Sequence, residues 1–137
     1  MPESIGPPTE PVDSSAFKGR RGFRRLINAT RYSMDGLAAA WRHENAFRQE
    51  LVLAAVLLPV AFVLPLPGVE KVLLIGSLLL VLIVELLNTA IEAAVDRDSV
   101  EIDPLGKRAK DYGSAAVMIS LLVAGLTWVT ILGSHYL

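Results

Sequence analysis

The sequence contains no cysteine, which excludes disulfides, thiolate metal sites and cysteine nucleophiles. Charge is also missing from one region, because no Asp, Glu, Lys or Arg follows Asp111. A P-loop, a glycine-rich kinase loop and a Rossmann fingerprint are all absent, so any nucleotide site must be of another kind. The 137 residues are 53% hydrophobic with a net charge of −1. This composition predicts a single domain and excludes a disordered or nucleic-acid-binding chain.

Three stretches are long and apolar enough to cross a bilayer: 51–69, 72–95 and 113–136. A transmembrane helix needs about 20 mostly apolar residues. The alternative is a water-soluble bundle, in which each helix would need a polar face. The first and third stretches contain no charged residue and the second contains only two. We therefore expect an all-α integral membrane protein with three transmembrane helices.

The N-terminal region divides into two parts of different composition. Residues 1–17 combine four prolines with Ser, Thr and acidic residues, which predicts a disordered tail and no signal peptide. From Phe23 onwards, apolar residues recur at helical spacing and arginines fall largely on the other face. This pattern predicts an amphipathic helix in the membrane interface, with its arginines toward anionic lipid headgroups; packing against protein is the alternative. The expected organisation is a tail, 1–17, and one membrane domain, 18–137, with a surface helix at about 20–45 and spans at about 48–66, 70–97 and 110–136.

The basic residues predict the orientation in the membrane. Twelve of the thirteen lie before the first span or between the second and third spans, and only Lys71 lies in the turn between the first two. Cytoplasmic loops collect Lys and Arg. We therefore expect the N-terminus and the 97–111 loop to be cytoplasmic and the C-terminus to lie on the opposite side.

The second span contains polar residues at helical spacing, namely Glu85, Asn88, Glu92 and Asp96. These positions share one helix face. Ionisable groups in a span cost roughly 2.5–3.5 kcal/mol each and persist where they function or find partners. At about 1.5 Å per residue, Glu85 lies about 16 Å deeper than Asp96. The stripe is therefore suited to bring a lipid headgroup and a water-soluble substrate together.

Other charged residues flank this stripe on the expected cytoplasmic side. Glu44 precedes the first span, and Lys110 and Asp111 begin the third. Mg²⁺ favours one or two carboxylates plus phosphate oxygens, which suits Glu44 with Glu92. A deeper glutamate, Glu85, is suited to act as a general base for an alcohol. A proton or ion relay and simple interhelical hydrogen bonding remain alternatives.

Three segments resemble the prokaryotic diacylglycerol kinase family: ELLNTAIEAAVD (85–96), AKDYGSAA (109–116) and AWRHENAFRQE (40–50). The resemblance extends from about residue 23 to 136. It implies transfer of the ATP γ-phosphate to the hydroxyl of diacylglycerol, giving phosphatidic acid, with Mg²⁺ as cofactor. It also implies a homotrimer with shared active sites in the inner membrane of a bacterium.

The resemblance assigns roles to individual positions. Glu85 matches the catalytic base, and Glu44 and Glu92 match the Mg²⁺ ligands. The positions that match nucleotide contacts are Arg25, Tyr32, Glu44, Glu92, Glu101, Ile102, Asp103, Lys110 and Asp111. The positions that match lipid contacts are Arg25, Ala29, Thr30, Arg31, Tyr32, Ser33, Met34, Ala38, Ala39, Ala40, Trp41, Ala46, Phe47, Arg48, Gln49, Glu50, Glu85, Ser114 and Trp128. Asn88 and Asp96 match other polar positions of the site, whereas the loop at 101–106 departs from the family pattern.

Two other functions are compatible with the sequence. An undecaprenol kinase would use the same kind of site with a polyprenol acceptor. A non-enzymatic membrane subunit would use Glu85 and Glu92 as an ion or proton relay, although the internal repeats typical of transporters are absent.

Overall fold

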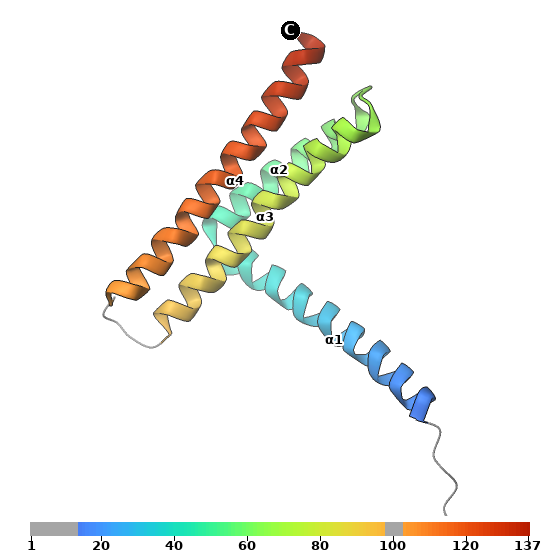
Figure 1. The fold of residues 1–137 in the computed structure, drawn as a ribbon, viewed down its shortest axis with the longest axis vertical. Helices are drawn as coiled ribbons and strands as arrows, with labels where there is room; N and C mark the ends of the chain where they lie inside the picture. Colours follow the sequence, from blue (N-terminus) through green and yellow to red (C-terminus); the bar gives the residue numbers. More distant parts are fainter. Residues whose placement is uncertain (1–13, 98–102) are drawn as a thin grey trace, which may run out of the picture. The chain divides into compact units, whose positions relative to one another are not determined.

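The computed structural model describes residues 14–97 and 103–137, with side chains from residue 18 onwards. The described residues form four helices: α1 (Ser14–His43), α2 (Asn45–Val63), α3 (Gly68–Asp96) and α4 (Pro104–Tyr136) (Figure 1). The chain divides into two compact units, 1–37 and 38–137, which are considered one at a time. The expected all-helical architecture is confirmed.

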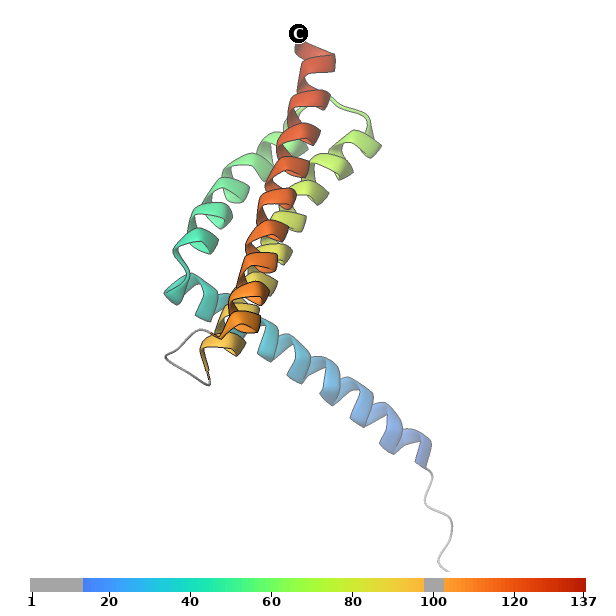
Figure 2. The ribbon, with the colours of Figure 1, turned by 60° about the vertical axis from the view of Figure 1, so that its left-hand side comes forward.

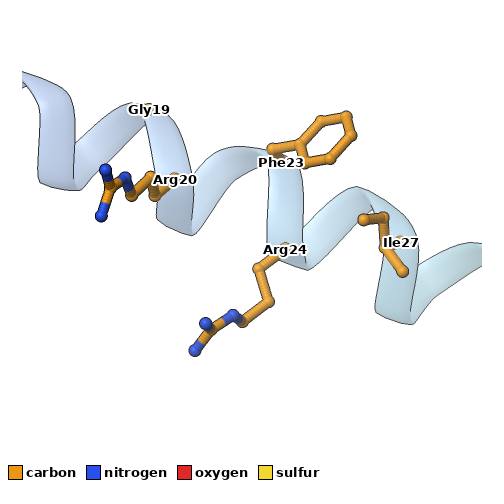
Figure 3. Close-up of a pocket in the computed structure, with 5 residues that line it drawn as sticks. All are labelled: Gly19, Arg20, Phe23, Arg24 and Ile27. Atoms are coloured by element: carbon orange, nitrogen blue, oxygen red, sulfur yellow. The ribbon is translucent and has the colours of Figure 1, made fainter.

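Most of α1 belongs to the first unit and has the expected amphipathic character. It begins at Ser14, so the expected tail 1–17 overlaps the helix at residues 14–17, and residues 1–13 lie outside the described part. An open pocket on the surface of α1 is lined by Gly19, Arg20, Phe23, Arg24 and Ile27. Figure 3 shows the side chains of Arg20 and Arg24 extending together, away from the ring of Phe23. Basic and aromatic groups are thus separated around the helix.

The three remaining helices are each long and apolar enough to span a membrane. α2 ends at Val63 because Leu64, which adopts an extended backbone, precedes Pro65. α4 begins six residues before the expected 110. The Asp103 side chain caps it by accepting a hydrogen bond from the Gly106 amide, and Pro104 suits the first turn. The three predicted spans are therefore confirmed, with shifted boundaries.

Within the second unit, α3 packs against both α2 and α4 (Figures 1 and 2). A small core lies near the α2–α3 turn, and its members are Ala61, Leu66, Leu74 and Ile131. The indole Nε1 of Trp128 donates to the Leu74 carbonyl at 3.3 Å. The α2–α3 turn and the C-terminus lie at one end of this unit, while the start of α2, the end of α3 and the start of α4 lie at the other.

Much of the surface of these helices remains exposed. The share buried in the most apolar window is 17% for α2, 33% for α3 and 11% for α4. Large aliphatic side chains such as Val56, Leu87 and Leu126 are more than half exposed. A membrane protein covers such surface with lipid or with other subunits, whereas a water-soluble bundle would leave it in contact with water.

Candidate functional site

Four carboxylates interact where α2 packs against α3. Glu44 and Glu50 come from the start of α2, and Glu85 and Glu92 come from the second half of α3. The Glu50 and Glu85 side chains are within hydrogen-bonding distance of each other. Glu44 and Glu92 are both near enough to Glu85 to interact with it electrostatically. We refer to these four residues as the carboxylate cluster.

Packing of α2 against α3 fixes the deepest members of the cluster. Phe47 and Ala54, which are 1% and 2% exposed, lie three residues before and four residues after Glu50 on the same face of α2. On α3, Val81 lies one turn before Glu85 and is also buried. Glu85 itself is only 5% exposed. The Glu50–Glu85 contact therefore lies within a packed apolar interface.

Arg48, which follows Glu44 by one helical turn, is directed elsewhere. Its guanidinium donates to the carbonyls of Trp41 and Arg42 at 3.2 and 3.3 Å and to Asn45 Oδ1 at 2.9 Å. These bonds stabilise the α1–α2 corner, where Glu44 occupies the N-cap position of α2. In residues 14–97 and 103–137, the ion pairs described do not include any member of the cluster.

Asn88 links the cluster to α4. Its Nδ2 donates to Glu92 Oε1 at 3.4 Å, a long hydrogen bond, while its Oδ1 is buried without a partner. Gly113 of α4 lies directly against this carboxamide. A Cβ added at Gly113 would overlap Asn88 Oδ1 and lie 3.3 Å from Asn88 Cγ. The absence of a side chain at Gly113 therefore allows α4 to approach Asn88 closely.

The predicted polar stripe does not act as one group. Its outermost member, Asp96, pairs with Lys110 Nζ at 2.6 Å and so connects the end of α3 to the start of α4. Asp111 pairs with Lys107 Nζ at 2.7 Å within α4. Because these pairs are partly or largely exposed, each contributes little to stability. The Asp96–Lys110 pair instead places a carboxylate and an ammonium group next to each other where α3 ends and α4 begins.

The other predicted site residues are distributed over both units. The candidates on α1 from Arg25 to Met34 are exposed and belong to the first unit. Ser114 is exposed near the start of α4. Trp128 lies eighteen residues beyond Lys110, about 27 Å along the helix, and packs at the other end of the unit. The structure thus does not bring Trp128 to the carboxylate cluster of its own chain. Glu101 and Ile102 lie outside the described residues.

In the described ranges, no group of three or more His, Cys, Asp or Glu side chains is arranged to hold a metal ion. A Mg²⁺ ion carried by a nucleotide does not require such a group, because phosphate oxygens and water complete its octahedral coordination. The hard oxygen donors of Glu44 and Glu92 fit this requirement. Both are intermediate in exposure, unlike the buried Glu85.

Two features of the site were missed by reasoning from residue patterns. One is the contact of Glu50 with Glu85, because helical periodicity groups only polar residues that belong to the same helix. The other is the contact of Gly113 with Asn88. A signal existed for Glu50, since it shares a helix face with Phe47 and Ala54. Gly113 offered no such signal, because its role depends on which residue of α3 it meets.

Comparison with known proteins agrees with these observations. Residues 31–132 match the family model described as prokaryotic diacylglycerol kinase. A diacylglycerol kinase of Pseudomonas aeruginosa is 56% identical over 121 residues, covering 88% of this chain and 98% of the relative. That of Escherichia coli K12 is 51% identical over 115 residues (84% and 94%), and one from Helicobacter pylori is 44% identical over 117 (85% and 91%). The prediction of a membrane-embedded lipid kinase is confirmed, and the chain belongs to the prokaryotic diacylglycerol kinase family.

Proposed function

We propose that this protein transfers the γ-phosphate of ATP to the hydroxyl group of diacylglycerol, giving phosphatidic acid. Family membership and the names of the relatives support this substrate. The observation that carries the proposal is the burial of Glu85 inside an apolar three-helix unit, with Glu44 and Glu92 close to it. A lipid hydroxyl approaches such a carboxylate from the bilayer, whereas ATP approaches from water.

Glu85 is proposed to accept the proton of the lipid hydroxyl. As this oxygen bonds to the γ-phosphorus, the bond from phosphorus to the β–γ bridging oxygen breaks and ADP leaves. The hydroxyl proton must pass to a base as its oxygen becomes bonded to phosphorus. Burial of Glu85 favours transfer of the phosphoryl group to the lipid hydroxyl rather than to water, because it keeps water away from the base.

Glu44 and Glu92 are proposed to hold Mg²⁺ together with the phosphates of ATP. When bound, the ion supplies neutralisation of charge on the β- and γ-phosphates. Asn88 supports this role because its Nδ2 donates to Glu92 Oε1 and so restricts the orientation of that carboxylate. The buried Glu85 would thus accept the proton, and the more accessible Glu44 and Glu92 would bind the metal.

Further residues are proposed to contact ATP and the lipid. Lys110 has three N–H donors, so its contact with Asp96 leaves donors for a phosphate. The remaining nucleotide contacts are proposed at Arg25, Tyr32, Glu101, Ile102, Asp103 and Asp111. Lipid contacts are proposed along α1, at the exposed Ala46 and Gln49 of α2, at Ser114 and at Trp128. The protein is proposed to act as a homotrimer with shared sites, in which Trp128 stays at the far membrane level and contacts the acyl chains of the lipid rather than the cluster.

The setting of the reaction is proposed to be the inner membrane of a bacterium. The α1 helix would lie on its cytoplasmic surface, because its arginines complement anionic headgroups and its apolar residues enter the interface. The N-terminus and the 97–111 loop would then be cytoplasmic and the C-terminus would lie on the opposite side. The exposed apolar surface of α2 and α4 supports contact with lipid and with two further copies.

A lipid kinase assay tests this function. Purified protein in vesicles receives labelled ATP, Mg²⁺ and either diacylglycerol or undecaprenol, and we expect labelled phosphatidic acid. We expect Glu85→Gln to lower turnover by at least about 100-fold. The matched control is Glu70→Gln, which changes a glutamate at the opposite end of the unit, where it contacts His135.

Each contrary result has a defined meaning. Phosphorylation of undecaprenol alone would replace the proposed acceptor. Ion flux without ATP consumption would replace the kinase by an ion relay. Full activity of Glu85→Gln would remove this residue from the role of base.

A further inference from the structure

Glu50 differs from the other carboxylates of the cluster in its surroundings. It is half-buried in the α2–α3 interface, and its side chain reaches Glu85. Its Oε2 atom is buried and has no hydrogen-bond partner. Arg48, the basic residue nearest to it in sequence, is held by three bonds at the α1–α2 corner. Among the titratable groups of the described residues, Glu85 is the one that interacts with the Glu50 carboxyl group.

A contact between two carboxyl side chains has a specific chemical requirement. A carboxylate only accepts hydrogen bonds, so one of the two groups must carry the proton that joins them. The group that donates fixes one oxygen of its partner and leaves the other oxygen available. Charge-assisted bonds of this kind are short and strong, and they hold both side chains in place. If Glu50 donates, Glu85 retains the lone pair needed to accept a proton from the substrate.

We propose that Glu50 is a positioning residue that donates a hydrogen bond to Glu85 and fixes its carboxylate to accept the proton of the lipid hydroxyl. This inference rests on the proposed function and deepens it. Glu50 takes no proton from the substrate: the hydroxyl proton passes to the free oxygen of Glu85, and the proton of Glu50 remains between the two side chains. The contact crosses from α2 to α3, so the packing of these two helices also fixes the base.

Two substitutions at Glu50 distinguish donation of a hydrogen bond to Glu85 from other roles of this side chain. Glu50→Gln keeps the length of the side chain and supplies an N–H donor, whereas Glu50→Met keeps the length and removes the donor. We expect Glu50→Met to lower kcat at least about tenfold, with little change in the KM for ATP or for diacylglycerol. We expect Glu50→Gln to retain kcat within about threefold of the wild type.

The matched controls are Glu70→Gln and Glu70→Met, at the opposite end of the unit. Both should leave kcat unchanged. Because Glu50→Gln is nearly isosteric with the wild type, its kcat tests the proposal even if Glu50→Met fails to fold.

Three outcomes would overturn the proposal. If Glu50→Gln loses as much activity as Glu50→Met, donation of a hydrogen bond is insufficient. If Glu50→Met has wild-type kcat, the contact has no catalytic consequence. If the KM for diacylglycerol rises with kcat unchanged, Glu50 is a lipid contact. In each case the wild type still phosphorylates diacylglycerol, whereas a wild type without this activity would refute the proposed function itself.

Discussion

Replacing Gly113 by alanine should destabilise the protein because α4 approaches Asn88 of α3 closely at this position. The added Cβ would overlap Asn88 Oδ1 and crowd its Cγ at 3.3 Å. Overpacking of this kind costs roughly 1–3 kcal/mol. Alanine is also a better helix former than glycine by about 1 kcal/mol, which offsets part of the loss.

A matched control separates these two effects. Gly125 lies in the same helix, and a Cβ added there meets nothing within 4 Å. Gly113→Ala and Gly125→Ala share the gain in helix propensity, so their difference isolates the overlap. We expect Gly113→Ala to be less stable than Gly125→Ala by roughly 1–3 kcal/mol in the free energy of unfolding.

Unfolding by SDS in mixed micelles, followed by tryptophan fluorescence, measures this difference. Kinetics provide a second readout, because displacement of Asn88 disturbs its bond to Glu92. We therefore expect the KM for Mg-ATP to rise in Gly113→Ala and to stay unchanged in Gly125→Ala. Equal stability of the two variants would refute the close approach of α4 to Asn88.

Three further predictions concern the metal ligands, the α2–α3 interface and the start of α4. Glu92→Gln should raise the concentrations of Mg²⁺ and ATP needed for half-maximal rate at least about tenfold, and an unchanged metal dependence would exclude it as a ligand. Phe47→Ala should lower the free energy of unfolding by about 3–5 kcal/mol because the side chain is almost completely buried, and a loss below about 1 kcal/mol would contradict that burial. Asp103→Ala should lower it by about 1 kcal/mol by removing the α4 cap, whereas Asp103→Ser should restore most of the loss; equal stability of both would argue against capping.

The helices were predictable because their signals are local. Apolar stretches of membrane length identify α2, α3 and α4, and the proline-rich turn after Leu64 explains where α2 ends. The boundary of α4 was less accessible, since it depends on whether Asp103 caps the helix. Capping requires a particular backbone geometry. The presence of an Asp in the sequence therefore allows a cap but does not show that one forms.

Part of the candidate site was predictable for the same reason. Glu85, Asn88 and Glu92 share a face because they belong to one helix, and helical periodicity alone places them together. Their partners come from other helices. Asp96 contacts Lys110 and Asn88 meets Gly113 only because α4 packs against α3 in one register.

The sequence by itself determined the membrane-spanning segments, the amphipathic α1 and the polar face of α3. These follow from hydrophobicity and from the period of the helix, which act over a few residues. Only the tertiary structure decided that Glu50 reaches Glu85. That contact joins residues 35 positions apart, and it depends on how side chains interlock between α2 and α3, which periodicity does not specify.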